Sequence, residues 1–453
     1  MKKQLYVGYA SLDVTPPLGV NLAGYYFDRI ADGVLDPLEV VALAVRSGDK
    51  TALIVSIDTL GLAKIFTDKI IAEASRKTGV PEDAFFVHST HTHLAPSVER
   101  TYKSEFENHL NDVYAEYLLF RTVDACVMAV EDLTPATLGI AKSKAEGVAF
   151  VRRFRMKDGS VRTNAGVNNP DILESIGTPD EEVSVVRFDR EGKETVLLVN
   201  FANHPDVIYG WQVSADWPGL TRRYVEKSLD AKCIVVNGAQ GDINHVNVNP
   251  SAAEWANFSP NDYSDTRPHY LHAKHIARVL TGAVLSVYEK AEYIEDYEIN
   301  YKKKLVDIPA NKPAPEDMPL ARKYYELHMA GRDDEVPYPT DGMVRTTVIA
   351  EACRMVELEH APDNFELPFT ALKIGPVSLF GIPGEPFSAI GKGIKAGKGN
   401  KLVIPCCTVN DYAGYFPTQD AFDEGGYEAR SSRFRAGVAE IIIDTGIEML
   451  SEL

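Results

Sequence analysis

The chain has 453 residues, of which 45% are hydrophobic, 25% charged and 9% aromatic, a composition typical of a globular protein with a large core. Lysine and arginine number 47 against 65 for aspartate and glutamate, which gives a formal net charge of −18. An acidic surface repels nucleic-acid phosphates, so the charge argues against a general nucleic-acid-binding role.

Cysteine usage and the amino-terminal segment point to a cellular location. The five cysteines show no Cys-x-x-Cys spacing, which predicts reduced and mostly buried thiols. Residues 1–25 lack the apolar stretch of about 7–15 residues that a signal peptide needs. No window approaches the ~18 consecutive apolar residues of a membrane span. We therefore expect a cytoplasmic protein without stable membrane association.

Short apolar runs rich in β-branched residues recur along the chain, with helical segments between them. Runs at 40–46 and 51–58, joined by a short polar turn, predict a strand hairpin. Further strands are predicted at 84–87, 183–188, 196–200, 233–236, 369–374, 377–382 and 402–405. An apolar stripe predicts a helix over 105–130, Pro218 fits the first turn of a helix ending near 229, and 269–288 reads as a third helix.

This alternation of strands and helices predicts an α/β fold with a large mixed β-sheet core flanked by helices. No internal repeat or low-complexity linker interrupts the chain, so we expect a single domain over residues 1–453. The segment 309–339 is dense in Pro, Lys, Glu and Asp around a short helical stretch. It is predicted to be a solvated insertion or a lid over a site.

The sharpest local motif is His88-Ser-Thr-His91-Thr-His93, directly after an apolar run. Residues i and i+2 of an extended backbone point to the same face, so His91 and His93 can reach one point. Neutral imidazole is a common zinc ligand, and the motif alone predicts a metal site that uses both histidines. The alternative is a pair of unrelated histidines in a polar loop.

Other polar residues also follow predicted strands. His204 stands directly before Pro205, just beyond an apolar run. The carboxylates Asp58, Glu385 and Asp242 occupy comparable positions, although each alone is equally compatible with a helix cap or a turn. Ligands of open α/β sheets gather beyond the carboxyl ends of strands, so these residues are candidates for one shared site.

Several common signatures are missing from the sequence. It contains no Gly-x-Ser-x-Gly elbow and no Gly-x-x-x-x-Gly-Lys-Ser/Thr or Gly-x-Gly-x-x-Gly loop, which argues against a serine hydrolase of that type and against the usual nucleotide sites. His269, His272 and His275 are spaced by three residues and are predicted to lie on a solvated helix.

Nine short motifs together resemble the neutral ceramidase family and occur in its order from residue 13 to about 430. They are Asp13-Val-Thr-Pro-Pro, Leu22-Ala-Gly-Tyr25, Ser56-Ile-Asp58, Thr90-His91-Thr92-His93, Phe201-Ala-Asn-His204, Ser214-Ala-Asp216, Gly241-Asp-Ile-Asn244, Pro383-Gly-Glu385, and Tyr415 followed by Tyr427-Glu428. The resemblance implies the fold of the ceramidase catalytic domain and a zinc-dependent hydrolysis of N-acyl amide bonds.

The resemblance also implies residue roles. One Zn²⁺ per chain would be held by His91, His204, Glu385 and Tyr415. His93 lies beside the metal rather than on it and becomes a candidate for proton transfer, as does Asp58, while Tyr427 matches a tyrosine near the scissile carbonyl. The candidates for substrate binding are Arg152, its close rival Arg153, Asn244 and Asp242.

The chain also departs from the family. Asn244, followed by His245, stands where the family has a serine, and the sequence lacks the additional carboxyl-terminal domain and the signal peptide of secreted ceramidases. These departures favour a soluble small molecule over ceramide as the substrate, and they leave open whether the chain forms a homo-oligomer.

The leading hypothesis is therefore a zinc-dependent hydrolase of an amide, or less favourably of an ester. One alternative is a glycoside hydrolase, which needs paired carboxylates about 5–9.5 Å apart; its candidates are Asp58, Asp242, Glu385 and Glu428. A second alternative is a non-catalytic zinc-binding or ligand-binding homologue, which a closed metal site would favour.

Overall fold

The computed structural model describes residues 4–98, 109–258, 266–340, 343–397 and 399–453. Its largest sheet has nine strands in the order β14-β12-β11-β6-β1-β3-β4-β5, with β16 also pairing with β6. The strands are β1 (Leu5–Asp13), β3 (Glu39–Ser47), β4 (Lys50–Ile57), β5 (Phe85–Ser89), β6 (Thr134–Lys144), β11 (Glu182–Arg190), β12 (Val196–Phe201), β14 (Lys232–Asn237) and β16 (Glu292–Ile294).

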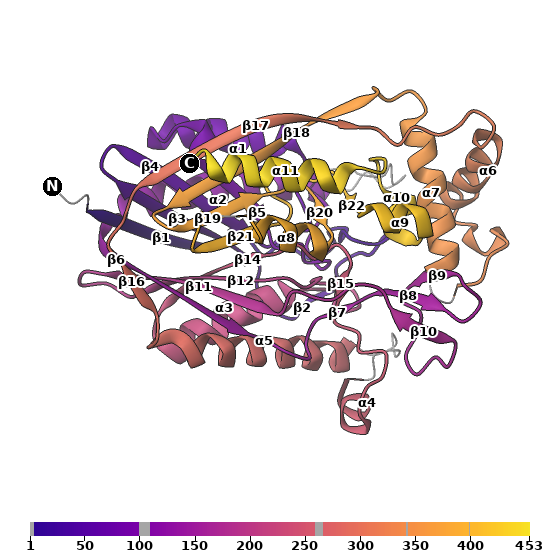
Figure 1. Ribbon diagram of the computed structural model, residues 1–453, viewed down its shortest axis with the longest axis horizontal. Coiled ribbons are helices and arrows are strands. Elements are labelled where there is room, and N and C mark those ends of the chain that lie inside the picture. The colour runs from indigo at the N-terminus through magenta and orange to yellow at the C-terminus, as the bar shows by residue number, and fades with distance from the viewer. Residues whose placement is uncertain (1–3, 99–108, 259–265, 341–342, 398) are drawn as a thin grey trace.

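A second sheet lies beside the first (Figure 1). It consists of β17 (Ile299–Pro309), β18 (Asn364–Ile374), β19 (Val377–Gly381) and β21 (Leu402–Cys406), in that order. Both sheets combine parallel and antiparallel pairs, with β4–β5, β12–β14 and β19–β21 parallel. The predicted α/β class and mixed sheet are confirmed, as is the hairpin that joins β3 to β4.

Short strands complete the β-structure near the ends of the two sheets. They are β2 (Gly33–Val34) with β13 (Gln212–Val213), β7 (Phe150–Val151) with β15 (Ile243–Asn244), β20 (Glu385–Pro386) with β22 (Tyr415–Phe416), and the group β8 (Arg153–Met156), β9 (Val161–Thr163) and β10 (Ile172–Ser175).

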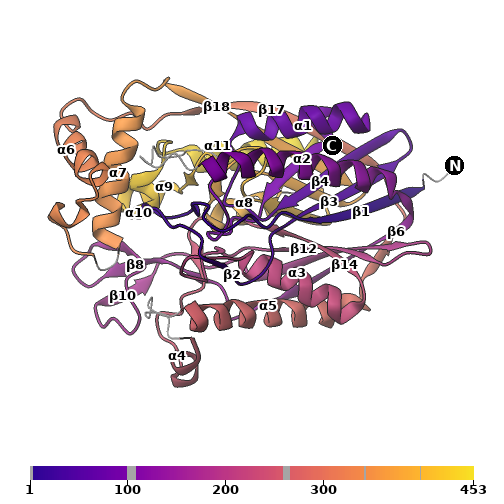
Figure 2. The ribbon, with the colours of Figure 1, turned by 180° about the vertical axis from the view of Figure 1, so that it is seen from behind.

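Helices cover the sheets on several sides (Figures 1 and 2). They are α1 (Lys64–Thr78), α2 (His109–Glu131), α3 (Asp216–Leu229), α4 (Ala252–Phe258), α5 (Thr266–Tyr288), α6 (Met318–Met329), α7 (Val344–Leu358), α8 (Ser388–Lys395), α9 (Gln419–Glu424), α10 (Tyr427–Ser431) and α11 (Val438–Ser451). Single 3₁₀ turns occur at Glu82–Ala84 and Asp333–Glu335.

The main hydrophobic core joins the two sheets, because side chains such as Ile54 of β4 and Leu379 of β19 belong to one buried cluster. A second cluster lies between the smaller sheet and helices α8 and α11, around Phe380 and Ile442. All five cysteines are buried and unpaired, as the sequence predicts. None of the helices within the described residues is both long and apolar enough to cross a membrane.

The predicted helix with Pro218 in its first turn, ending near residue 229, is confirmed as α3, and the predicted helix at 269–288 is confirmed as α5. On α2 the stripe positions Leu110, Val113, Tyr117 and Phe120 are 39% to 57% exposed, and the buried face includes Tyr114, Leu118 and Ala125 instead. The expectation for the α5 histidines was wrong. On α5 the expected solvated histidines are largely covered, since His269 and His272 are buried. The ring of His272 stacks on Phe258 with centroids 4.3 Å apart, a contact that helical periodicity alone does not reveal.

The predicted helix at 105–130 begins four residues before the part of α2 that is described, and Phe106 of its stripe lies outside the described residues. The segment 309–339 contains α6, which packs against α7 through a small buried cluster that includes Tyr324 and Val348. The segment is thus packed on one side rather than solvated throughout. Its role as a lid stays a prediction.

The large sheet curls so that β14 lies against β4 and β5. The hydroxyl of Ser56 donates to the carbonyl of Val235 at 2.8 Å, and the amide of Asn237 donates to Nε2 of His88 at 3.0 Å. Since the Ser56 proton is used, Nδ1–H of His88 donates to the Ser56 hydroxyl at 3.2 Å. Burial lowers the pKa of His88 to about 3, so this neutral ring ties together strands whose carboxyl ends carry the site.

The His88 tie predicts a specific pH dependence of stability. Folded His88 stays neutral down to a pKa of about 3, whereas an unfolded histidine takes a proton near pH ~6.5. The contribution of His88 to the free energy of unfolding is therefore complete above that pH. Below it, this contribution falls by about 1.4 kcal/mol per pH unit. At neutral pH the variant His88→Gln should have a lower free energy of unfolding than the wild-type protein. This difference, measured by urea unfolding, should become smaller as the pH falls from 6 to 4.

A pH-independent margin would contradict this assignment of the His88 proton. The matched control is His360→Gln, because the His360 side chain is 90% exposed and should leave the pH dependence unchanged.

Candidate metal centre

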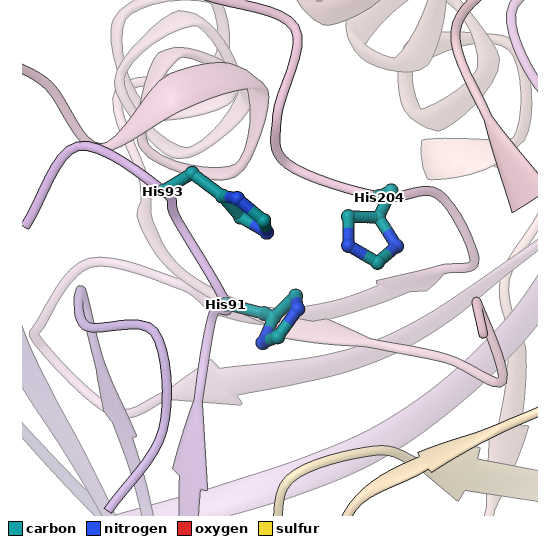
Figure 3. Close-up of side chains that lie close together, drawn as sticks. All are labelled: His91, His93 and His204. Carbon is teal, nitrogen blue, oxygen red and sulfur yellow. The ribbon is translucent and has the colours of Figure 1, made fainter. Parts of the chain in front are cut away.

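Three histidines that follow strands β5 and β12 of the large sheet meet in one place. His91 and His93 follow β5 and His204 follows β12, and their nearest ligand atoms all lie within 4.8 Å of one another. Ring centroids are 5.1 Å apart for His91 and His93, 4.8 Å for His91 and His204, and 5.1 Å for His93 and His204. Figure 3 shows the three rings around a common space.

The His91 ring is held in one orientation. Its backbone has a φ of 71°, in the left-handed region that non-glycine residues rarely adopt. Nδ1 lies 2.6 Å from the carbonyl oxygen of Leu60. A carbonyl can only accept, so Nδ1 carries a hydrogen, and in the neutral ring Nε2 then carries a lone pair. That lone pair lies 3.2 Å from Oε2 of Glu385, an approach of two acceptors that calls for a cation between them.

Glu385 is fully buried at the start of β20. Its Oε1 accepts from the Tyr412 hydroxyl at 2.9 Å, and its Oε2 lies 3.7 Å from Nε2 of His204. Burial alone would raise the pKa of Glu385, but its positively charged surroundings, which include the Arg152 guanidinium, lower it below its ordinary value. The group is therefore an ionised carboxylate aimed at the histidines.

The histidines also leave buried nitrogen atoms without hydrogen-bond partners. Among the described residues these atoms are Nε2 of His91, both ring nitrogens of His93 and Nδ1 of His204. Unpaired buried polar atoms are costly, so a cluster of them indicates a missing partner. Burial lowers the pKa of His204 to about 3 and that of His93 well below its ordinary value. Neutral imidazoles beside an anionic carboxylate suit a divalent cation.

A glycine fixes the position of His93. Gly24 has a φ of 98°, and a Cβ atom on it would lie 2.5 Å from Nδ1 of His93. The Leu22-Ala-Gly-Tyr25 motif of the sequence thus has a physical role, because only glycine gives the His93 ring room at this point.

Two tyrosines adjoin the centre. Tyr415 pairs with Glu385 across β20 and β22, and its hydroxyl accepts from Nη2 of Arg152 at 3.2 Å. The ring of Tyr427 lies 5.6 Å from that of Tyr415, and its hydroxyl is 3.0 Å from the hydroxyl of Tyr26. Burial raises the pKa of Tyr427 to about 12, so this phenol keeps its proton at neutral pH.

The centre opens on a cavity of about 770 Å³. Of the predicted site residues, the cavity is lined by His91, His93, His204, Glu385, Tyr415, Tyr427, Arg152 and Asn244. Other wall residues, notably Tyr26, Asp206, Tyr209, His245 and Tyr412, have no motif or spacing in the sequence that predicts a site. Asp206 and His245 nevertheless stand close in sequence to predicted site residues, Asp206 two positions after His204 and His245 directly after Asn244.

The structure separates the two rival arginines. Arg152 is buried on the cavity wall, where it donates to Oε1 of Glu428 at 2.7 Å and to the Gly241 carbonyl at 2.8 Å. Arg153 points elsewhere and pairs with Glu424 at 3.3 Å. Asn244 lies on the wall with its amide donating to Oδ1 of Asn164 at 2.7 Å.

Two predicted carboxylates are absent from the described cavity wall. Asp58 is fully buried and pairs with Arg222 at 2.6 Å. Asp242 accepts from the backbone and hydroxyl of Ser388 at 2.6 and 3.0 Å, at the start of α8. Both contacts hold these carboxylates away from the cavity wall, and the roles of Asp58 in proton transfer and of Asp242 in substrate binding stay predictions.

The fold matches known structures over its whole length. The chain is similar to the neutral ceramidase of Pseudomonas aeruginosa with a TM-score of 0.74 and 16% identity, covering 100% of this chain and 75% of that one. It is similar to a ceramidase complexed with C2 with a TM-score of 0.72 and 15% identity, covering 99% of this chain and 76% of that one. The sequence matches no family model and no curated protein. The fold is that of the neutral ceramidases, as the sequence resemblance implied.

Proposed function

We propose that this protein is a zinc-dependent hydrolase that cleaves an amide bond of a small molecule. The observation that carries the proposal is the cluster of buried imidazole nitrogens without hydrogen-bond partners, one of which, Nε2 of His91, lies 3.2 Å from the Glu385 carboxylate on the wall of a substrate-sized cavity. The ceramidase structures that share this fold support the same class of reaction.

The residues best suited to hold one zinc ion per chain are His91, His204 and Glu385, with Tyr415 as a fourth ligand from the strand paired with Glu385. Bound zinc supplies a Lewis acid that polarises the scissile carbonyl and lowers the pKa of water toward ~7. Tyr415 is buried with a raised pKa, so its phenol stays neutral until a cation stabilises the phenolate.

Other side chains would then act directly on the substrate. Tyr427 keeps its proton at neutral pH and can donate to the developing oxyanion, a contribution of roughly 2.7–4 kcal/mol for donors of this kind. Arg152, which is fixed by Glu428, presents a buried positive charge on the same wall. His93 is neutral with unpaired ring nitrogens, so it can accept a proton from the attacking water and return it to the leaving amine.

The glycoside hydrolase alternative has less support. Of its four candidate carboxylates, Glu385 alone lies on the described cavity wall. Glu428 is held by Arg152 and by the Thr163 hydroxyl at 2.9 Å, and Asp58 and Asp242 are held in the structural contacts described above. A non-catalytic metal site is also disfavoured, because structural sites are closed whereas this one opens on a cavity.

The first prediction from this proposal concerns metal content. Purified protein should contain about one zinc per chain by elemental analysis, and His91→Ala and His204→Ala should each lose most of it, because each removes a ligand of the site. The exposed His360 provides the matched control, His360→Ala, which should keep its zinc. Unchanged zinc in both ligand variants would refute the proposed centre.

The second prediction concerns the reaction. A panel of N-acyl amino sugars, N-acyl amino acids and short-chain ceramides should include a substrate that releases free amine. A chelator should stop the release and added zinc should restore it. Turnover of glycosides without turnover of any amide would replace this proposal by the glycoside hydrolase alternative.

The third prediction concerns Tyr427. Replacing it as Tyr427→Phe removes one hydrogen-bond donor while leaving the ring in place, so kcat on the best amide should fall by about 10²–10³-fold. Zinc content should stay at the wild-type level. An unchanged kcat would show that Tyr427 does not contact the developing oxyanion.

A further inference from the structure

One face of helix α7 forms a wall of the same cavity. Its lining residues are Met343, Thr346, Ala350, Arg354 and Glu357, spaced by three or four positions as expected for a single helix face. The chemistry of this wall differs from that of the metal centre, because it contributes a guanidinium group rather than imidazoles. Arg433, which follows α10, adds a second guanidinium to the lining.

Arg354 is buried and held rigidly by neutral groups. Its Nε donates to the Arg430 carbonyl at 2.9 Å and its Nη1 donates to the Asn311 carbonyl at 2.6 Å. Among the described residues its Nη2 has no hydrogen-bond acceptor and makes a long ion pair with Oε1 of Glu351 at 3.9 Å. The side chain is therefore fixed in place, with one donor group that makes no hydrogen bond.

The nearby carboxylates are engaged by other arginines. Glu351 accepts two hydrogen bonds from Arg430 at Oε2, which leaves only its Oε1 for the long ion pair with Arg354. Glu357, the acidic residue on the α7 wall, pairs with Arg433 at 2.9 Å. Burial lowers the pKa of Arg354 more than Glu351 raises it, so its charge is only partly compensated, although the group stays ionised at neutral pH. A buried, incompletely compensated cation favours an anionic partner.

We propose that Arg354 is a specificity-determining residue, which binds an acidic group of the substrate, a carboxylate or a phosphate, at the α7 wall of the cavity. The inference rests on the proposed amide hydrolysis and narrows its substrate to an N-acyl compound that carries a negative charge away from the scissile bond. The rigid guanidinium, whose Nη2 makes no hydrogen bond within the protein, selects for charge, since a neutral amide in the place of the acidic group forms a weaker hydrogen bond.

Binding of non-hydrolysable probes tests this proposal separately from turnover. The probes are N-(hexylsulfonyl)glycine, its phosphate counterpart N-(hexylsulfonyl)-O-phosphoethanolamine, and the neutral N-(hexylsulfonyl)glycinamide, measured by calorimetry on zinc-loaded protein. An acidic probe should bind about 10- to 100-fold more tightly than the neutral one. In Arg354→Gln this preference should disappear, because the glutamine amide can still donate a hydrogen bond to either kind of probe but carries no charge.

Two further variants distinguish the loss of the acidic-group site from a general loss of structure. Ala350→Asp places a carboxylate one helical turn from Arg354 and should abolish the preference without removing the bonds of Arg354 to the backbone. Arg322→Gln is the matched control, since Arg322 is an exposed arginine of α6 and its loss should leave the preference intact. Zinc content at the wild-type level shows that each variant retains its metal centre.

Equal affinity of wild-type protein for acidic and neutral probes, or a preference that survives in both Arg354→Gln and Ala350→Asp, would overturn the assignment. The carboxylate and phosphate probes identify which acidic group is preferred. If amides are hydrolysed without any preference for charge, this inference fails and the proposed function stands. If the Arg354-dependent preference is present but no amide is cleaved, the acidic-group site stands and the proposed reaction fails.

Discussion

The approach of His91 to Glu385 is the interaction on which the site depends. The Leu60 carbonyl fixes the hydrogen on Nδ1 of His91, which leaves a lone pair on Nε2 pointing at a carboxylate oxygen 3.2 Å away. Both groups are buried, so water cannot screen the contact. His204 adds a second neutral ring to the same carboxylate. A cation bound between the neutral rings and the carboxylate would satisfy the unpaired nitrogens and the buried negative charge together.

The site residues come together because the large sheet curls. His91 follows β5 and His204 follows β12, strands that stand far apart in the sheet order, and the tie between β5 and β14 through His88 brings their carboxyl ends together. Glu385 begins the short strand β20, which pairs with β22 and follows β19 of the second sheet after a short turn. The buried polar side chains around the centre are of two kinds. Asp58 and Arg222 form an ion pair with each other, whereas the histidines have ring nitrogens without partners, which can bind a ligand.

Much of this arrangement could be predicted from the sequence, because strand-end residues follow local patterns. The histidines after apolar runs were identified by spacing, and the mixed sheet by the alternation of strands and helices. Contacts between distant segments could not be predicted. The rings of His272 and His275 on α5 contact Phe258 of α4. Asp58 forms an ion pair with Arg222, which lies more than 160 positions away in the sequence. The α7 wall has no motif, so Arg354 emerges only from the folded structure.

Anomalous diffraction at the zinc absorption edge, from crystals of the protein purified without added metal, tests the central claim most directly. The account predicts one strong peak per chain, within about 2.0–2.3 Å of a nitrogen of His91, a nitrogen of His204 and a carboxylate oxygen of Glu385. A peak at another cluster, such as the α5 histidines, would contradict it. So would the absence of any peak at the His91–Glu385 contact after zinc is supplied.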